Sequence, residues 1–220
     1  MTTFVIVVIL VLIAMVIFGL LWRIASRLWF LPCPWWLIVF IEKKFEQTLA
    51  RSSTLLDRAG VALGMQVLDV GCGAGRLSLA AAERVGSSGR VVALDIKEPM
   101  ILRLQGRLVE RGLSNVYPVL AGAGEGKLEC ETFDRAFLVT VLGEIPDRSK
   151  AMREIYEALK PGGLLSVTEM FPDPHYQTRN KVRELAGQAG MRFDQSFGNA
   201  MAFTMHFLKP GGRNVANYVD

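Results

Sequence analysis

The sequence predicts a doubly wound α/β fold, a parallel sheet with helices on both faces, preceded by a membrane-spanning N-terminal helix. Residues 67–80, VLDVGCGAGRLSLA, combine a strand of buried character, a glycine-rich turn and the start of a helix. Residues 91–100, VVALDIKEPM, repeat the strand-to-helix pattern, and their strand ends in an acid, Asp95. Residues 4–21 form an unbroken apolar run. The first two stretches predict the sheet, and the third predicts the membrane helix.

The expected elements follow from apolar runs and from the residues that start or stop them. Short apolar runs predict strands at 66–70, 90–95, 116–121, 133–142, 164–170, 192–197 and 202–208. Helical periodicity predicts helices at 76–85, 99–111, 148–159 and 176–189. Pro99 suits a first helical turn, because the N–H that proline lacks has no partner there. Pro161 and the two glycines after it stop a helix and reverse the chain, and Gly198–Asn199 suits a hairpin connection.

The glycine-rich turn indicates which kind of cofactor the sheet binds. Doubly wound sheets bind adenosine-type cofactors at the carboxyl ends of their strands. Gly71, Gly73 and Gly75 can take backbone angles closed to other residues and let a ligand approach the main chain. In the dinucleotide pattern G-x-G-x-x-G the third glycine would stand where this chain has Arg76. Asp69, just before the turn, would repel the negative charge of a pyrophosphate and would attract a cation.

Four ordered stretches resemble a known family. Asp95, 24 residues after Gly71, is placed to accept hydrogen bonds from both ribose hydroxyls. The spacing G-x-G-x-G with a preceding acid resembles motif I of the class I S-adenosylmethionine-dependent methyltransferases. Residues 133–142, FDRAFLVTVL, and 159–169, LKPGGLLSVTE, resemble the fourth strand of that family and the passage into the fifth. The resemblance implies a Rossmann-like seven-stranded class I methyltransferase sheet, closed by an antiparallel pair. A bare glycine turn and an NAD-dependent reductase remain as alternatives.

The resemblance also implies a binding site for S-adenosylmethionine. The turn would hold the methionine end of the cofactor, with Asp69 near its ammonium group, and Asp95 would bind the ribose. The expected cofactor-binding residues are Asp69, Gly71, Cys72, Gly73, Gly75, Asp95, Ile96, Met100, Gly122, Ala123 and Thr140. Many relatives have Gly-Asp-Ala-Glu after the third strand, where this chain has Gly-Ala-Gly-Glu, so the usual adenine-binding carboxylate is missing. Glu125 either substitutes from a shifted loop or is solvated.

Glu144 and His175 are the candidate catalytic residues. Glu144 replaces histidine in a run that reads Leu-His-His-Leu-Pro-Asp in relatives, and a carboxylate there would orient or deprotonate an acceptor. The alternative is that it caps or pairs locally. His175, in the loop after the fifth strand, is a candidate base because imidazole titrates near neutrality, although a surface position is the alternative. His206, within the last strand, is expected to be structural. No metal-ligand pattern occurs.

The N-terminal segments predict attachment to a membrane. Residues 1–22 are interpreted as a transmembrane anchor, because 18 apolar residues nearly match the roughly 30 Å hydrocarbon core. Arg23 and Arg27 follow this run and no Lys or Arg precedes it, which puts the catalytic domain on the cytoplasmic side and disfavours a cleaved signal peptide. The three cysteines are odd in number and widely spaced, which suits a reduced compartment.

Four further segments complete the predicted organisation. Residues 23–41 contain all four tryptophans and two prolines and are interpreted as an interfacial membrane segment, with a second span or packing on the domain as alternatives. Residues 42–64 are expected to form an amphipathic lead-in helix, 65–208 the methyltransferase domain and 209–220 a flexible tail.

The sequence thus predicts a single-pass membrane enzyme that moves a methyl group from S-adenosylmethionine to a small hydrophobic or lipid-like acceptor. A catalytically silent, cofactor-binding membrane adaptor is the alternative. The expected partners are the bilayer and the acceptor. The net charge of +4 is spread along the chain, with no basic repeat, so no nucleic-acid partner is expected. The acceptor atom and the oligomeric state stay open.

Overall fold

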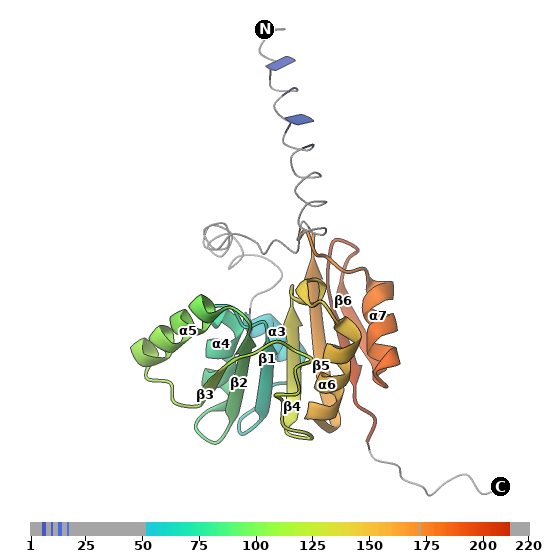
Figure 1. Cartoon of the computed structure of the whole chain (residues 1–220). Helices are drawn as coiled ribbons and strands as arrows, with labels where there is room; N and C mark the ends of the chain where they lie inside the picture. Colours follow the sequence, from blue (N-terminus) through green and yellow to red (C-terminus); the bar gives the residue numbers. More distant parts are fainter. Residues whose placement is uncertain are drawn as a thin grey trace, which may run out of the picture.

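The protein is described by a computed structural model that covers residues 6, 7, 10, 13, 14 and 17, and then 52–171 and 173–211. Its centre is a seven-stranded sheet of order β3-β2-β1-β4-β5-β7-β6 (Figure 1). The strands are β1 Gln66–Val70, β2 Arg90–Asp95, β3 Val116–Leu120, β4 Phe133–Val139, β5 Leu159–Met170, β6 Arg192–Gly198 and β7 Ala202–Leu208. Strands β1 to β5 pair in parallel, and β7 runs antiparallel to both of its neighbours. The predicted Rossmann-like methyltransferase sheet is therefore confirmed.

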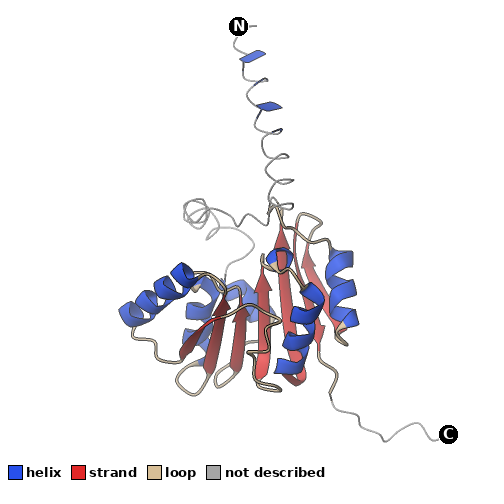
Figure 2. Ribbon diagram, viewed as in Figure 1, coloured by secondary structure: helices blue, strands red, loops and turns tan. Residues whose placement is uncertain are grey.

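Helices cover both faces of this sheet (Figure 2). They are α3 Ser52–Arg58, α4 Arg76–Val85, α5 Glu98–Arg111, the short 3-10 helix η1 Leu142–Glu144, α6 Arg148–Ala158 and α7 Arg179–Gln188. Successive strand residues point to opposite faces, so Val67 packs in the apolar cluster of α3, α4 and α5, and Leu68 packs in the cluster of α6 and α7. Two such buried faces explain why β1, β2 and the later part of β5 are largely apolar.

Several element bounds differ from the expected ones. Strand β4 ends at Val139 and not at residue 142, because Thr140 has a left-handed backbone and η1 begins two residues later. Strand β5 begins at Leu159 and not at residue 164, since the segment with Gly162 and Gly163 pairs with the chain after β7. Helix α7 begins at residue 179 and not at 176, because Thr178 is its N-cap.

The lead-in helix and the tail also differ in part from expectation. Of residues 42–64, the structure describes only 52–64, where α3 covers Ser52–Arg58 and turns then lead to β1. Lys209, assigned to a flexible tail, is buried, and its ammonium group donates to the carbonyl of Leu159 at 2.7 Å. The fold thus extends past Leu208, and residues 212–220 lie outside the described part.

The predicted anchor and interfacial segment lie almost wholly outside the described residues. The six residues described between 6 and 17 are helical, and their side chains are exposed. Within the described ranges, no helix is both long and apolar enough to cross a bilayer.

Candidate active site

The glycine turn lies between the carboxyl ends of β2 and β4, because β1 stands between these strands in the sheet. The N–H groups of Gly71 and Cys72 both donate to the carbonyl of Leu94, at 2.7 and 3.0 Å. This carbonyl belongs to β2, so the turn is fixed to the neighbouring strand. Helix α4 begins directly after the turn, so its N-terminus lies at the same edge of the sheet.

The three glycines of the turn are required for three different reasons. All have left-handed backbones, with φ values of 70°, 54° and 85° for Gly71, Gly73 and Gly75. A Cβ on Gly71 would lie 2.3 Å from a methyl carbon of Val141, and one on Gly75 would lie 2.3 Å from a methyl carbon of Leu104. A Cβ on Gly73 would meet nothing within 4 Å. Gly71 and Gly75 therefore permit internal packing, and Gly73 faces open space where a ligand has room to approach the backbone.

Asp95 connects this turn to the loop after β2. Its carboxylate accepts hydrogen bonds from the N–H of Gly73 at 2.8 Å and from the N–H of Lys97 at 2.9 Å. Lys97 is the N-cap residue of α5, so the carboxylate also supports the start of that helix. Asp95 is 8% exposed and stands beside the open space at Gly73, which fits the expected role in binding a ribose.

Asp69 lies beneath the turn and is buried. Its carboxylate accepts a hydrogen bond from the Ser78 hydroxyl at 2.6 Å. Burial raises the pKa of Asp69 to about 6, although the Ser78 hydrogen bond and the positive charge of Arg76 oppose the shift. A cationic group of a cofactor would favour the ionised form of Asp69. The carboxylate therefore fits an ammonium group.

Cys72 contributes packing to the turn. Its side chain is buried in the cluster of α3, α4 and α5. Burial raises the pKa of the Cys72 thiol, and the negative charges of Asp69 and Asp95 raise it further. The thiol is therefore not activated as a nucleophile.

The expected adenine-side residues come from the loops after β2 and β3. Ile96 is exposed, and its Cγ2 lies 3.2 Å from the position of a Cβ on Gly122. A carboxylate oxygen of Glu125 lies 2.7 Å from the same position, so this acid folds back beside Gly122. Glu125 is itself exposed, so the solvated alternative describes its position in this structure. Ala123 is half-buried against the core, and Met100 is buried under the start of α5.

Glu154 organises the same loop and was not anticipated from the sequence. It is buried on α6 and accepts hydrogen bonds from the N–H groups of Lys127 at 2.7 Å, Leu128 at 3.1 Å and Gly124. An acid on the apolar face of an amphipathic helix was the available signal, since such a residue needs buried partners.

Thr140 occupies the carboxyl end of β4 with φ of 54°, an unusual backbone for a β-branched residue. Its N–H donates to the carbonyl of Thr168 at 2.8 Å, and its hydroxyl donates to the carbonyl of Val139 at 2.7 Å. These bonds hold the strained residue at the edge where the resemblance expected it to contact the cofactor.

Glu144 and His175 approach the site from η1 and from the loop after β5. Glu144 pairs with Lys97, whose ammonium nitrogen lies 3.3 Å from a carboxylate oxygen, so its partner is 47 residues away and not a local one. His175 is buried, and its backbone packs directly on Gly143, where a Cβ would lie 1.8 Å from the carbonyl oxygen of His175. The two candidate catalytic residues are thus carried by segments in contact.

Glu169 holds the loop that carries His175. It is 1% exposed, one carboxylate oxygen accepts the N–H of Gln177 at 2.9 Å, and the other has no hydrogen-bond partner among the described residues. Burial raises the pKa of Glu169 to about 8, with smaller opposing effects from the Gln177 N–H and Arg148 and a further rise from Asp173. The sequence placed Glu169 at the binding edge without a role.

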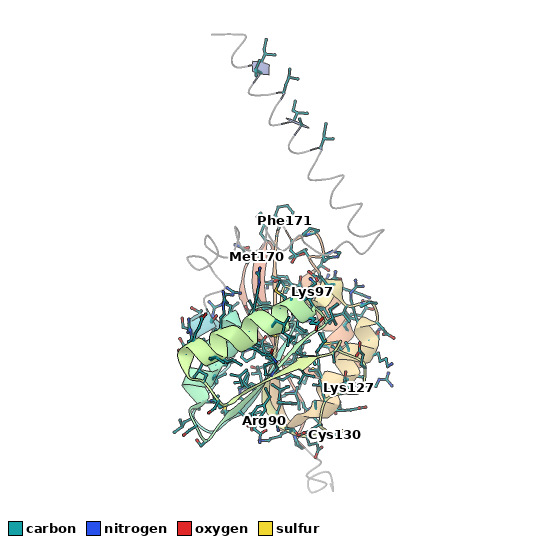
Figure 3. All side chains as sticks on the ribbon, turned by 60° about the vertical axis from the view of Figure 1, so that its left-hand side comes forward. Arg90, Lys97, Lys127, Cys130, Met170 and Phe171 are labelled. Carbon is teal, nitrogen blue, oxygen red and sulfur yellow. The ribbon has the colours of Figure 1, made fainter. Side chains whose placement is uncertain are left out.

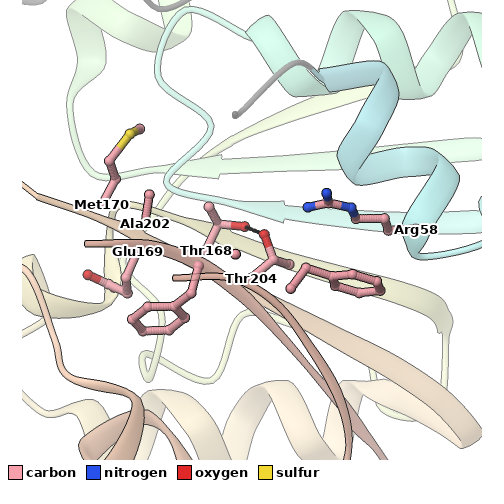
Figure 4. A pocket seen from close by; sticks show the side chains of 9 residues that line it. Arg58, Thr168, Glu169, Met170, Ala202 and Thr204 are labelled. Carbon is pink, nitrogen blue, oxygen red and sulfur yellow. Dashed lines mark hydrogen bonds between the residues drawn. The ribbon is translucent and has the colours of Figure 1, made fainter. Parts of the chain in front are cut away.

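A small pocket opens at the carboxyl end of β5 (Figure 4). It is lined by Arg58, Thr168, Glu169, Met170, Phe197, Gly198, Ala202, Phe203 and Thr204. The hydroxyls of Thr168 and Thr204 are hydrogen-bonded to each other at 2.9 Å. Most of the other lining side chains are apolar, and the cavity volume is about 10 Å³, which is room for about one water molecule. Within the described ranges, no three potential metal ligands lie together.

Comparison with known proteins decides the family. A model of the methyltransferase domain matches residues 63–200, more than half of the chain. The chain belongs to the S-adenosylmethionine-dependent methyltransferases. The fold agrees with a crystal structure of a SAM-dependent methyltransferase from Aquifex aeolicus, at a TM-score of 0.67 and 24% identity over 72% of this chain and 89% of the other.

The curated relatives have more specific names. The chain is 38% identical to the ubiquinone/menaquinone biosynthesis C-methyltransferase UbiE of Idiomarina loihiensis over 128 residues. These residues are 58% of this chain and 51% of the relative. It is 34% identical to the nocamycin O-methyltransferase of Saccharothrix syringae over 120 residues, which are 54% of this chain and 43% of the relative. The chain thus spans about half the length of these relatives.

Proposed function

We propose that this methyltransferase transfers a methyl group from S-adenosylmethionine to a small hydrophobic acceptor at the surface of a membrane. The observation that carries the cofactor assignment is the open space at Gly73 with the Asp95 carboxylate beside it. When bound, S-adenosylmethionine supplies a methyl group on a sulfonium, which is an excellent leaving group. The protein then has to position the reactants and exclude water.

The residues divide this work between the two sides of the site. Asp95 accepts hydrogen bonds from the ribose hydroxyls, and the ionised form of Asp69 is favoured by the ammonium group. Gly73 lets the cofactor approach the backbone. Glu144 orients or deprotonates the acceptor through the carboxylate oxygen that does not face Lys97, and His175 is a second candidate base.

The names of the relatives support a hydrophobic acceptor. The names of several relatives assign them to C-methylation in ubiquinone and menaquinone biosynthesis, which favours a quinone-like ring as the first acceptor to test. Another relative is an O-methyltransferase, so carbon and oxygen both remain candidate acceptor atoms.

We further propose that residues 1–22 anchor the protein, with 23–41 at the interface and the catalytic domain on the cytoplasmic side. The apolar run at 4–21 and the arginines after it support this orientation. The described residues in the run are helical with exposed apolar side chains, as a lipid-facing helix requires. A membrane-held enzyme takes a hydrophobic acceptor directly from the bilayer.

Calorimetric titration of the detergent-solubilised full chain with S-adenosylmethionine and with NADH tests the cofactor assignment. We expect binding of S-adenosylmethionine alone, weakened at least tenfold by Asp95→Ala and unchanged by Asp57→Ala, an exposed acid far from the turn. Preference for NADH, or no binding, would contradict the proposal.

Turnover separates the enzyme from the silent adaptor. Incubation of the wild-type chain with labelled cofactor and membrane-lipid extracts should label a hydrophobic product. Tight cofactor binding without transfer to any extract would support the adaptor, and a label confined to soluble protein would refute the acceptor class.

A crystal structure named as the [4+2]-cyclase SpnF shares the fold at a TM-score of 0.65 and 20% identity over 73% of this chain and 80% of the other, so the fold alone does not fix the reaction.

A further inference from the structure

One ion pair connects segments that are far apart in the sequence and lie on opposite sides of the cofactor site. Lys97 follows β2, and Glu144 lies in η1 after β4. The ammonium nitrogen and the carboxylate oxygen are 3.3 Å apart, and the two side chains are only 29% and 26% exposed. Figure 3 places Lys97 toward the same end of the domain as Met170, the last residue of β5. The pair thus belongs to the carboxyl edge of the sheet.

The sheet order places the two segments of this pair on either side of β1 and its glycine turn. Strand β1 lies between β2 and β4, so the two segments are separated by two strand spacings, about 10 Å. The glycine turn fills that interval, because Gly71 is bonded to Leu94 on one side and packs on Val141 on the other. Only a long side chain such as lysine reaches from one side to the other.

The backbone of Lys97 ties the same residue to the ribose acid. Its N–H donates to Asp95 at 2.9 Å, and Asp95 accepts the N–H of Gly73 at 2.8 Å. A continuous set of polar contacts therefore runs from Gly73 through Asp95 and Lys97 to Glu144. This set borders the open space at Gly73, which the proposed function assigns to the cofactor.

We propose that Lys97 is a positioning residue that, with Glu144, forms a strap which closes over bound S-adenosylmethionine. The pair opens to admit the cofactor and closes behind it, so it slows cofactor release and holds Glu144 on the acceptor side. The inference rests on the proposed function only in taking S-adenosylmethionine as the cofactor.

A double-mutant cycle on cofactor release tests the strap. Dissociation rates of S-adenosylmethionine and S-adenosylhomocysteine would be measured by stopped flow on the full chain in detergent for wild type, Lys97→Met, Glu144→Gln and the double variant. We expect each single variant to release both ligands about three- to tenfold faster, in keeping with one partly buried ion pair. The double variant should release them no faster than either single one, because each change alone breaks the strap.

Two controls separate the strap from other roles of these residues. Lys97→Arg keeps the charge and the reach and should restore most of the slow release. Lys181→Met breaks an exposed pair on α7, Lys181–Glu184, and should leave release unchanged. Simple repulsion between Lys97 and the sulfonium would make Lys97→Met bind S-adenosylmethionine more tightly, which would overturn the strap.

The other outcomes are also decisive. Additive effects in the cycle, or release rates equal to those of wild type, would overturn the strap while leaving the proposed function intact. Absence of cofactor binding by the wild-type chain would overturn the proposed function and the strap together.

Discussion

Gly73 and Gly75 lie two positions apart in one turn, yet substitution should affect them differently. Gly75→Ala adds a methyl group against Leu104 at a left-handed backbone, and we expect it to destabilise the fold by about 2–4 kcal/mol. Gly73→Ala adds a methyl group to open space, so only the backbone strain of about 1 kcal/mol applies to the fold, whereas cofactor binding should fall at least tenfold. Urea unfolding and calorimetry of both variants measure the two effects, and equal losses of stability would contradict this assignment.

Glu169 should make the stability of the protein depend on pH. Burial raises its pKa from 4.5 to about 8, so the folded protein keeps a proton that the unfolded chain releases above about pH 4.5. The free energy of unfolding should therefore fall as pH rises from 5 to 8. Glu169→Gln removes this contribution. Its free energy of unfolding should therefore fall less between pH 5 and pH 8 than that of wild type, by an amount on the order of a few kcal/mol.

Urea unfolding of both proteins at pH 5 and pH 8 checks this expectation. The exposed control Asp57→Asn should follow the wild-type curve. A Glu169→Gln variant with the wild-type pH dependence would show that the carboxyl group titrates normally.

Single residues of the site were predictable from sequence where the reason is local. The glycine turn and Asp95 stand at fixed spacing, and the structure brings them together. Glu154 and Glu169 act through partners 26 or more and 8 residues away, respectively, and such partners depend on how the chain folds. The pairing of Glu144 with Lys97 was not predictable for the same reason, since 47 residues separate them.

At the scale of elements, the loop after β3 depends on a single side chain of α6. We expect Glu154→Ala to free three backbone N–H groups, to destabilise the protein by about 2–4 kcal/mol and to weaken cofactor binding. Hydrogen exchange should quicken at Gly124, Lys127 and Leu128. Glu157→Ala, on the exposed side of the same helix, should change neither quantity, and unchanged exchange in Glu154→Ala would refute this role.

Elements were predicted well in their centres and less well at their ends. The centre of a strand or helix is fixed by local apolar periodicity, and all seven strands were expected. Ends depend on contacts that periodicity does not contain. Strand β5 gained five residues because its start pairs with the chain after β7, and β4 lost three because Thr140 departs from the strand backbone.

At the scale of the whole molecule, the proposed anchor predicts which end of the domain faces the bilayer. Phe171 and Met201 are exposed apolar residues at the carboxyl edge and are joined by a backbone hydrogen bond of 2.6 Å. Ser52, the first residue of α3, bonds to the start of α4, so the chain enters at this edge. Cys130 lies at the opposite end of the domain from Phe171 (Figure 3). We expect Phe171 to contact lipid and Cys130 to face water.

Spin labels on the full chain in lipid nanodiscs measure this orientation. Phe171→Cys would be labelled in a background with Cys33 and Cys130 replaced by serine, and native Cys130 would be labelled with only Cys33 replaced. Cys72 is buried, and its pKa is raised, so it stays unlabelled. The label at 171 should be accessible to oxygen, which concentrates in lipid, and the label at 130 to a water-soluble nickel chelate. Equal exposure of both to the nickel chelate would refute the orientation.

The architecture as a whole was predicted through the family resemblance more than through periodicity. Periodicity gives strands but not the sheet that they form. The seven-stranded sheet with its closing antiparallel pair was expected because four stretches between residues 67 and 169 resemble the family. The acceptor was not predictable in this way, because the four stretches identify the family and its cofactor and none of them specifies an acceptor.

The backbone of Thr140 has a consequence for engineering. A threonine with φ of 54° costs the folded protein on the order of 1–3 kcal/mol, and glycine would carry the same angle without that cost. Selection for heat resistance alone should therefore favour Thr140→Gly. The same change would loosen the end of β4 beside the reacting groups. Thermal selection without an activity screen would therefore raise thermal stability at this position and lower the turnover rate.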